Sequence, residues 1–171
     1  MAESAVEVLA NPNYPTTAAD YKAYDAVMKE MEAKVTTMHN MVNTLDDLRQ
    51  KMAGIVKNVE GKKGDKELIK DGKALIEKVK AWDEKMIQRK SKAYDDVENF
   101  PNKFTANYLF LINQTESAIP RVNQPNLDRK KELDAKWESL EKEGMDLLKT
   151  AIPAYNTRLC EAGIGALWEM D

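Results

Sequence analysis

The sequence has one cysteine, one histidine, seven glycines and six prolines among its 171 residues. A single cysteine excludes a disulfide framework and a thiolate metal site, and a single histidine excludes a centre with several imidazole ligands. So few glycines and prolines argue against a β-sandwich or barrel, which needs a turn every ~8–12 residues. No apolar run reaches the ~18–20 residues of a membrane span. The formal net charge of -3 gives no electrostatic basis for binding nucleic acid.

The first fifteen residues differ from the rest of the chain. Residues 4–9, SAVEVL, alternate apolar and polar side chains in the pattern of a short strand. Two prolines, Pro12 and Pro15, then interrupt regular structure. This start has no basic region followed by an apolar one, so it does not resemble a signal peptide. We therefore expect 1–15 to be an extended linker that carries the severed end of a strand from something upstream, and 16–171 to form one helical domain.

Four amphipathic stripes follow. Thr16 or Thr17 is suited to cap a first helix over 17–59, with Asp20 in its first turn. Apolar residues recur in that helix at steps of three and four, namely Tyr24, Met28, Met31, Val35, Met38, Val42, Leu45, Leu48, Met52 and Ile55. After a turn at 61–64, Asp65 is suited to cap a second helix that ends in a basic run near residue 90.

The third stripe predicts a shorter helix over 102–118, with Phe104, Tyr108, Leu111, Ile112 and Thr115 facing inward. The fourth predicts a helix from Asn126 that Pro153 kinks and Gly163 ends. Short loops place each helix antiparallel to the one before it. The expected fold is therefore all-α, an elongated up-down-up-down four-helix bundle with a short N-terminal extended segment.

One candidate ligand site is a cluster of thioethers around the single imidazole: Met28, Met31, Met38, Met41 and His39. Thioethers and imidazole suit Cu(I). Methionine at core positions of a helix is more often a gap filler, and we expect that role here. A di-iron centre needs Glu-x-x-His pairs, which one histidine with Thr36 three residues before it does not provide.

The other candidates have simpler explanations. Asp46-Asp47 and Asp95-Asp96 with Glu98 lack the cleft that paired carboxylates need for glycoside hydrolysis, and they lack the spacing of a calcium loop. The turn Gly61-Lys62-Lys63-Gly64 lacks the phosphate-loop spacing. Cys160 has no partner for nucleophilic catalysis, and we expect Asn113-Gln114-Thr115, a formal glycosylation sequon, within a helix. Packing is the expected role of the tryptophans, which are Trp82, Trp137 and Trp168. No residue is therefore assigned to catalysis, to a cofactor or to a metal.

A set of turn prolines and packing residues covers most of the chain from residue 94. It comprises Tyr94-Asp95-Asp96, Phe100-Pro101-Asn102-Lys103-Phe104, Leu111, Ile119-Pro120, Gln124-Pro125, Leu133, Trp137, Ile152-Pro153-Ala154-Tyr155-Asn156, Leu159 and Ala162-Gly163-Ile164. In this set the chain resembles the C-terminal helical region of large bacterial BNR-repeat, sortilin-like β-propeller proteins, often labelled glycosyl hydrolases. Val6, Val8 and Asn11-Pro12-Asn13 would then match the strand and turn that leave the β-sandwich of that family.

The resemblance implies a non-catalytic C-terminal module of a larger exported protein, periplasmic or at the cell surface. Its partners would be the upstream β-sandwich and propeller domains, or another protein, without nucleic acid and without membrane insertion. Any hydrolytic activity would belong to the propellers. The alternative is a self-contained bundle that binds a small ligand or a metal at the Met/His cluster. A homo-oligomer through the first helix also stays open, because its stripe suits a coiled coil.

Overall fold

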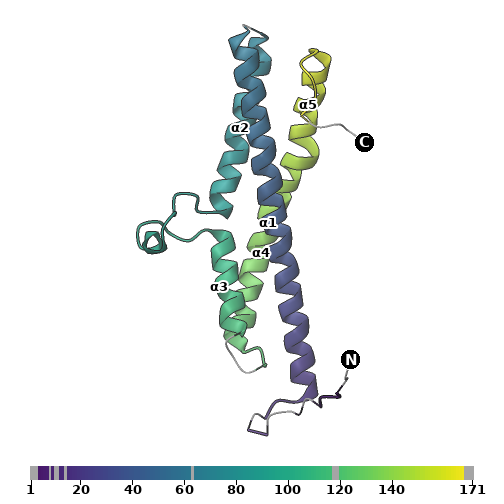
Figure 1. The fold of residues 1–171 in the computed structure, drawn as a ribbon, viewed down its shortest axis with the longest axis vertical. Coiled ribbons are helices and arrows are strands. Elements are labelled where there is room, and N and C mark those ends of the chain that lie inside the picture. Colours follow the sequence, from purple (N-terminus) through teal and green to yellow (C-terminus); the bar gives the residue numbers. More distant parts are fainter. Residues whose placement is uncertain are drawn as a thin grey trace.

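The computed structural model describes residues 4–7, 9, 12–13, 15–62, 64–116 and 120–167. Within these ranges the regular structure is entirely helical, as the sequence predicts (Figure 1). None of the helices there combines the length and apolar character needed to cross a membrane. In chain order the elements are α1 (Ala18–Gly61), α2 (Lys66–Met86), the 3-10 turn η1 (Tyr94–Val97), α3 (Phe104–Glu116), α4 (Gln124–Asp146), the π-helical turn η2 (Leu147–Ala151) and α5 (Ile152–Glu161).

The predicted caps begin the first two helices. Thr17 and Asp20 form a reciprocal capping box at α1, in which the Asp20 N–H donates to Thr17 Oγ1 over 3.2 Å and the Thr17 N–H donates to Asp20 Oδ2 over 2.9 Å. The Asp65 carboxylate accepts the N–H groups of Glu67 and Leu68 at the start of α2. These local hydrogen bonds fix the helix starts because they satisfy backbone donors that have no partner within the helix.

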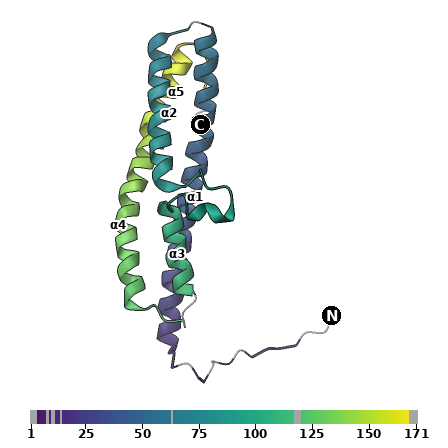
Figure 2. The ribbon, with the colours of Figure 1, turned by 90° about the vertical axis from the view of Figure 1, so that its left-hand side faces the viewer.

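The helices form three columns that run along the length of the molecule (Figure 2). One is α1 alone. The second is α2 followed end to end by α3, and both pack on α1. The third is the unbroken run of α4, η2 and α5, which contacts α3 through α4 and α2 through both α4 and α5. The chain thus rises along α1, descends through α2 and α3, and rises again (Figure 1).

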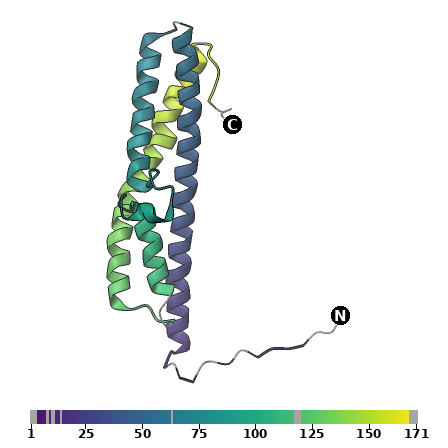
Figure 3. The same cartoon turned by 60° about the vertical axis from the view of Figure 1, so that its left-hand side comes forward.

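The up-down-up-down order expected from the sequence is therefore not confirmed. Residues 87–103 do not reverse the chain; they leave the second column and return to it (Figure 3). The Thr105 hydroxyl donates to the carbonyl of Met86, the last residue of α2, over 2.8 Å. The Gln88 side chain donates to the Pro101 carbonyl over 3.2 Å, which joins the two ends of this excursion. These hydrogen bonds between distant residues set α3 in line with α2, and helical periodicity carries no information about them.

The third column contains the irregularity expected of Pro153. The Ile152 N–H donates to the carbonyl of Leu147, five residues back, as in a π-helix. This wide turn lies directly before the proline, which lacks an N–H and crowds the preceding turn of a regular helix. The column ends as predicted, with Gly163 at a φ of 67° and the Ile164 N–H donating to the Leu159 carbonyl over 3.0 Å.

The strand expected over 4–9 is not formed in the described part of that segment. Residues 4–7 and 9 have neither helix nor strand, and Val6 and Leu9 are exposed. The segment lies away from the columns in Figures 2 and 3, where it has no neighbouring strand to supply the hydrogen bonds of a ladder. Val8 and Asn11 lie outside the described residues.

The three columns meet in close packing at Gly144 of α4. A Cβ atom built there would lie 2.9 Å from Trp82 Cζ2 of α2 and would overlap the Met41 sulfur of α1. The Trp82 indole N–H donates to the Leu140 carbonyl over 2.8 Å, so α2 and α4 are also joined by a buried hydrogen bond. Gly144 is thus required by space and not by backbone conformation.

We expect Gly144→Ala to destabilise the protein by about 1–3 kcal/mol, because the added methyl group overpacks the contact. Gly54→Ala is the matched control, since a Cβ atom at Gly54 in α1 meets nothing within 4 Å. Alanine favours the helix, so this control should stabilise the protein by roughly 0.5–1 kcal/mol. Urea unfolding of both variants measures the difference. Equal effects would show that Gly144 is not a packing constraint.

Candidate functional site

The Met/His cluster of the sequence analysis lies mostly in the core. Met28, Met31, Met38 and Met41 are all buried, and Met41 packs against Gly144. His39 is half-buried. The four thioethers are part of the hydrophobic core, whereas His39 is not among its buried residues.

The paired carboxylates serve local structure. Asp46 is half-buried and accepts hydrogen bonds from Arg49 and Gln50, whereas Asp47 is exposed. The Asp96 carboxylate accepts the N–H groups of Lys92 and Ala93 and so orders the start of η1. The two pairs lie in different elements and do not form one site.

The remaining candidates are scattered over the molecule. Cys160 of α5 is exposed, and so is Asn113 of the sequon, which lies within α3. Trp82 and Trp137 are buried in the core. Lys63 of the basic turn and Trp168 lie outside the described residues. In the part of the chain that is described, no three His, Cys, Asp or Glu side chains are grouped to hold a metal ion.

A network of four charges joins α1 to α4. Lys130 of α4 bridges Glu30 of α1, at 2.8 Å, and Asp134 of its own helix, at 2.7 Å. Lys34 of α1 contacts the same two carboxylates, at 2.6 Å and 2.8 Å. The Tyr108 hydroxyl of α3 donates to Asp134 over 2.7 Å and brings the second column into the network.

The network sets the ionisation of its members. Burial acts to raise the pKa of Asp134, but the hydrogen bonds from Lys130, Lys34 and Tyr108 outweigh it, so the pKa lies below its ordinary value. Hydrogen bonds from Lys130 and then Lys34 lower the pKa of Glu30. Burial, followed by the hydrogen bond to Asp134, raises the pKa of Tyr108. These groups are fixed in their charge states at neutral pH, which indicates a structural clamp and not a proton donor.

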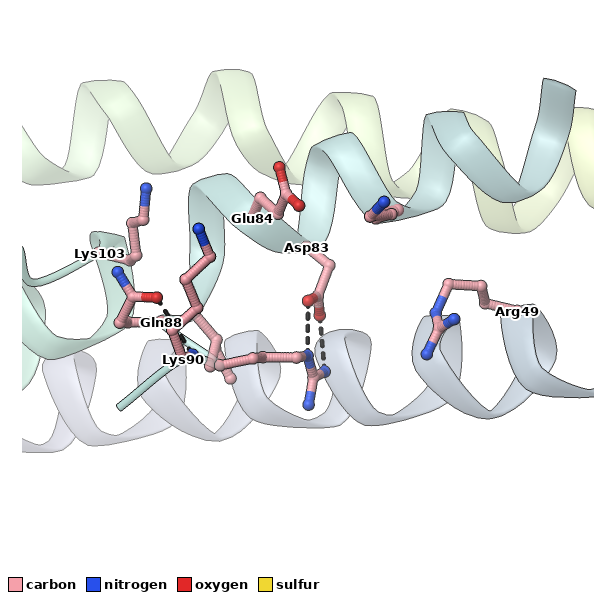
Figure 4. A pocket seen from close by; sticks show the side chains of 9 residues that line it. Arg49, Asp83, Glu84, Gln88, Lys90 and Lys103 are labelled. Carbon is pink, nitrogen blue, oxygen red and sulfur yellow. Dashed lines mark hydrogen bonds and ion pairs between the residues drawn. The ribbon is translucent and has the colours of Figure 1, made fainter. Parts of the chain in front are cut away.

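A cavity of about 320 Å³ lies at the break between α2 and α3, beside α1 (Figure 4). Asp83 of α2 is almost fully buried and points toward α1, where it accepts two hydrogen bonds from Arg89, of 2.6 Å and 2.7 Å. This fork holds the first residues of the excursion 87–103 against α2. Five cationic residues line the cavity, together with Asp83 and Glu84: they are Arg49, Lys80, Arg89, Lys90 and Lys103.

The outer face of α3 has a different character. Leu109 and Phe110 are exposed on it, Phe110 by 62% of its surface. Glu116 is the only charged residue of this thirteen-residue helix, in a chain in which 32% of residues are charged. A hollow of about 290 Å³ lies beside Phe110, between α3 and α4, with Asn107 and Arg129 in its lining. We define the outer face of α3 as Ala106, Asn107, Leu109, Phe110, Asn113 and Gln114.

Neither the cavity nor this face is evident from the sequence. The basic run near residue 90 indicates only the end of the second helix, and Lys103 gives no signal because only the fold brings it near Lys90. The lack of charge in 104–115 was a usable signal for the outer face of α3. Comparisons of the chain with protein-family models, with curated proteins and with solved structures found no match.

The charge network predicts an acid-sensitive fold. The pKa of Asp134 is lower in the folded protein than the ordinary value of about 4, so its contribution is complete above pH ~4 and is lost as the pH falls through the lowered pKa. We expect Asp134→Asn to cost roughly 2 kcal/mol at pH 7 and to reduce the loss of stability between pH 7 and pH 3. Melting curves by circular dichroism over this range measure both effects.

The control is Asp25→Asn, which removes an exposed pair with Lys29 on α1. Exposed pairs of this kind contribute about 0–1 kcal/mol, so the control should follow the wild-type pH dependence. A pH profile of Asp134→Asn that coincides with the wild type would show that the clamp does not stabilise the fold.

Proposed function

We propose that this chain is a non-catalytic helical module that acts through protein interaction, with the outer face of α3 as the contact surface. The observation that carries the proposal is the exposed Phe110 on a helix face without charge, in a protein rich in charge. Interface centres are depleted in charged residues and enriched in aromatic ones, and this face has both properties. The network of carboxylates and amines described above has structural partners and supports no catalytic role.

The geometry beside Phe110 supports the same role. The hollow between α3 and α4 adjoins the ring and is lined by Leu111 and by the polar side chains of Asn107, Gln114, Asn126 and Arg129. A pocket of this kind accepts an apolar side chain of a partner while its polar rim supplies hydrogen bonds, as at the anchor positions of interfaces. Burial of the Phe110 ring would contribute about 25 cal/mol to the free energy of binding for each Å² of apolar surface removed from water.

The resemblance to the C-terminal region of BNR-repeat, sortilin-like β-propeller proteins suggests which domains cover the outer face of α3. We propose that the chain is a terminal module of a larger exported protein of that kind. Its preceding β-sandwich or propeller domains would then cover the outer face of α3. The exposed Val6 and Leu9 lie in the segment that would lead from those domains.

The size of the native polypeptide tests this setting. An antibody raised against the domain should detect, in blots of cell fractions, a band several times larger than 19.4 kDa in the envelope or secreted fraction. A band near 19.4 kDa in the cytoplasm would contradict the terminal-module setting and leave the contact surface to be tested separately.

Photo-crosslinking tests the surface. With benzoyl-phenylalanine at position 110 of the native protein, we expect a crosslink to the preceding domains, identified by mass spectrometry. The control places the same group at Thr150, which is exposed on the third column. Because position 110 is exposed, its replacement should change the free energy of unfolding by no more than about 0.5 kcal/mol. Crosslinking at 110 that does not exceed crosslinking at 150 would refute this contact surface.

A further inference from the structure

We infer that the cavity at the break between α2 and α3 binds a small phosphate-bearing molecule, held by the ammonium groups of Lys90 and Lys103. These two side chains come from the two ends of the excursion 87–103 and line the same cavity, on the side of the Asp83–Arg89 fork away from Arg49 (Figure 4). The site is distinct from the outer face of α3, and the inference does not depend on the proposed function.

Several of the charges that line the cavity are already neutralised. Asp83 and Arg89 form a two-bond fork, and the Arg49 guanidinium donates to Asp46 over 2.9 Å and 2.7 Å. Lys80 has a single long contact of 3.6 Å, to Glu77. Among the described residues, the ammonium groups of Lys90 and Lys103 contact no carboxylate within 4.0 Å. Two cations therefore line one cavity without a carboxylate partner among the described residues, in a protein whose net charge is -3.

The two ammonium groups, which have no carboxylate partner among the described residues, suit a phosphate. An ammonium group binds phosphate as a point charge. The volume of about 320 Å³ exceeds that of a bare phosphate and falls at the lower end of small-molecule pockets, ~300–1,000 Å³. A phosphorylated small molecule fits this space and this charge.

One lining group opposes an anion. Glu84 of α2 is exposed, and no described residue forms an ion pair with it. Its carboxylate repels a phosphate in the cavity, so it lowers the affinity without blocking the space. Removing the charge of Glu84 should therefore strengthen phosphate binding, whereas removing the charges of Lys90 and Lys103 should weaken it.

The experiment is an NMR titration of the ¹⁵N-labelled protein with sodium pyrophosphate at low ionic strength. We expect saturable shifts in the amide signals of residues 87–90 and Lys103. Lys90→Gln combined with Lys103→Gln should weaken binding by about tenfold or more, the loss expected for charge-assisted hydrogen bonds. Glu84→Gln should tighten binding by roughly threefold, as expected for one removed charge in a screened site.

Lys57→Gln is the matched control, because it removes the same charge from an exposed position on α1 outside the cavity lining. It should leave the affinity within about twofold. If Lys57→Gln lowers the affinity for pyrophosphate as much as the double variant does, the binding is a general attraction between charges. That result would overturn the inference. Absence of shifts at 87–90, or weaker binding by Glu84→Gln, would overturn it as well. Melting curves of each variant verify that the fold is intact.

Discussion

The buried hydrogen bond from the Trp82 indole to the Leu140 carbonyl is the contact on which the three-column arrangement depends. A buried indole N–H without a partner costs free energy, so α4 must lie close enough to α2 for its backbone to accept that hydrogen. Gly144, one turn further along α4, allows this approach because it has no side chain, and Met41 of α1 fills the remaining space. One polar group and one missing side chain thereby fix the relative positions of all three columns.

Contacts on either side of Gly144 also hold the columns together, but they use different side chains. Toward the free end of α5, Gly72 of α2 leaves room for the Tyr155 ring, and the Tyr155 hydroxyl donates to the Leu68 carbonyl over 3.2 Å. Toward the start of α1, the ion pairs Lys130–Glu30 and Lys34–Asp134 join α4 to α1. Polar groups that reach across columns are satisfied at each level, and this specifies one alignment of the columns where apolar stripes alone would permit several.

Local features of the fold were predictable from the sequence, and the order of the columns was not. Thr17 with Asp20, Asp65 and Gly163 act within one turn of their own helices, so their roles can be recognised from spacing alone. The inward residues of α3 were also predicted correctly, because periodicity reports which face of a helix is buried. The Thr105–Met86 hydrogen bond links residues on either side of a long excursion, and no periodic pattern indicates it. The cavity depends on that same alignment, which is why its lysines were not recognised together.

Hydrogen bonds join the two ends of the excursion 87–103. The length and sequence of this segment can therefore change without a change in the helices. Gln88 and Pro101 hold its two ends together, and Thr105 continues the column from Met86. The length of chain between these ties does not set the register of α2 or α3, and lengthening a closed loop costs little free energy. Residues can be gained, lost or exchanged there while the columns stay in place. The fold can thus remodel one wall of its charged cavity without repacking its core.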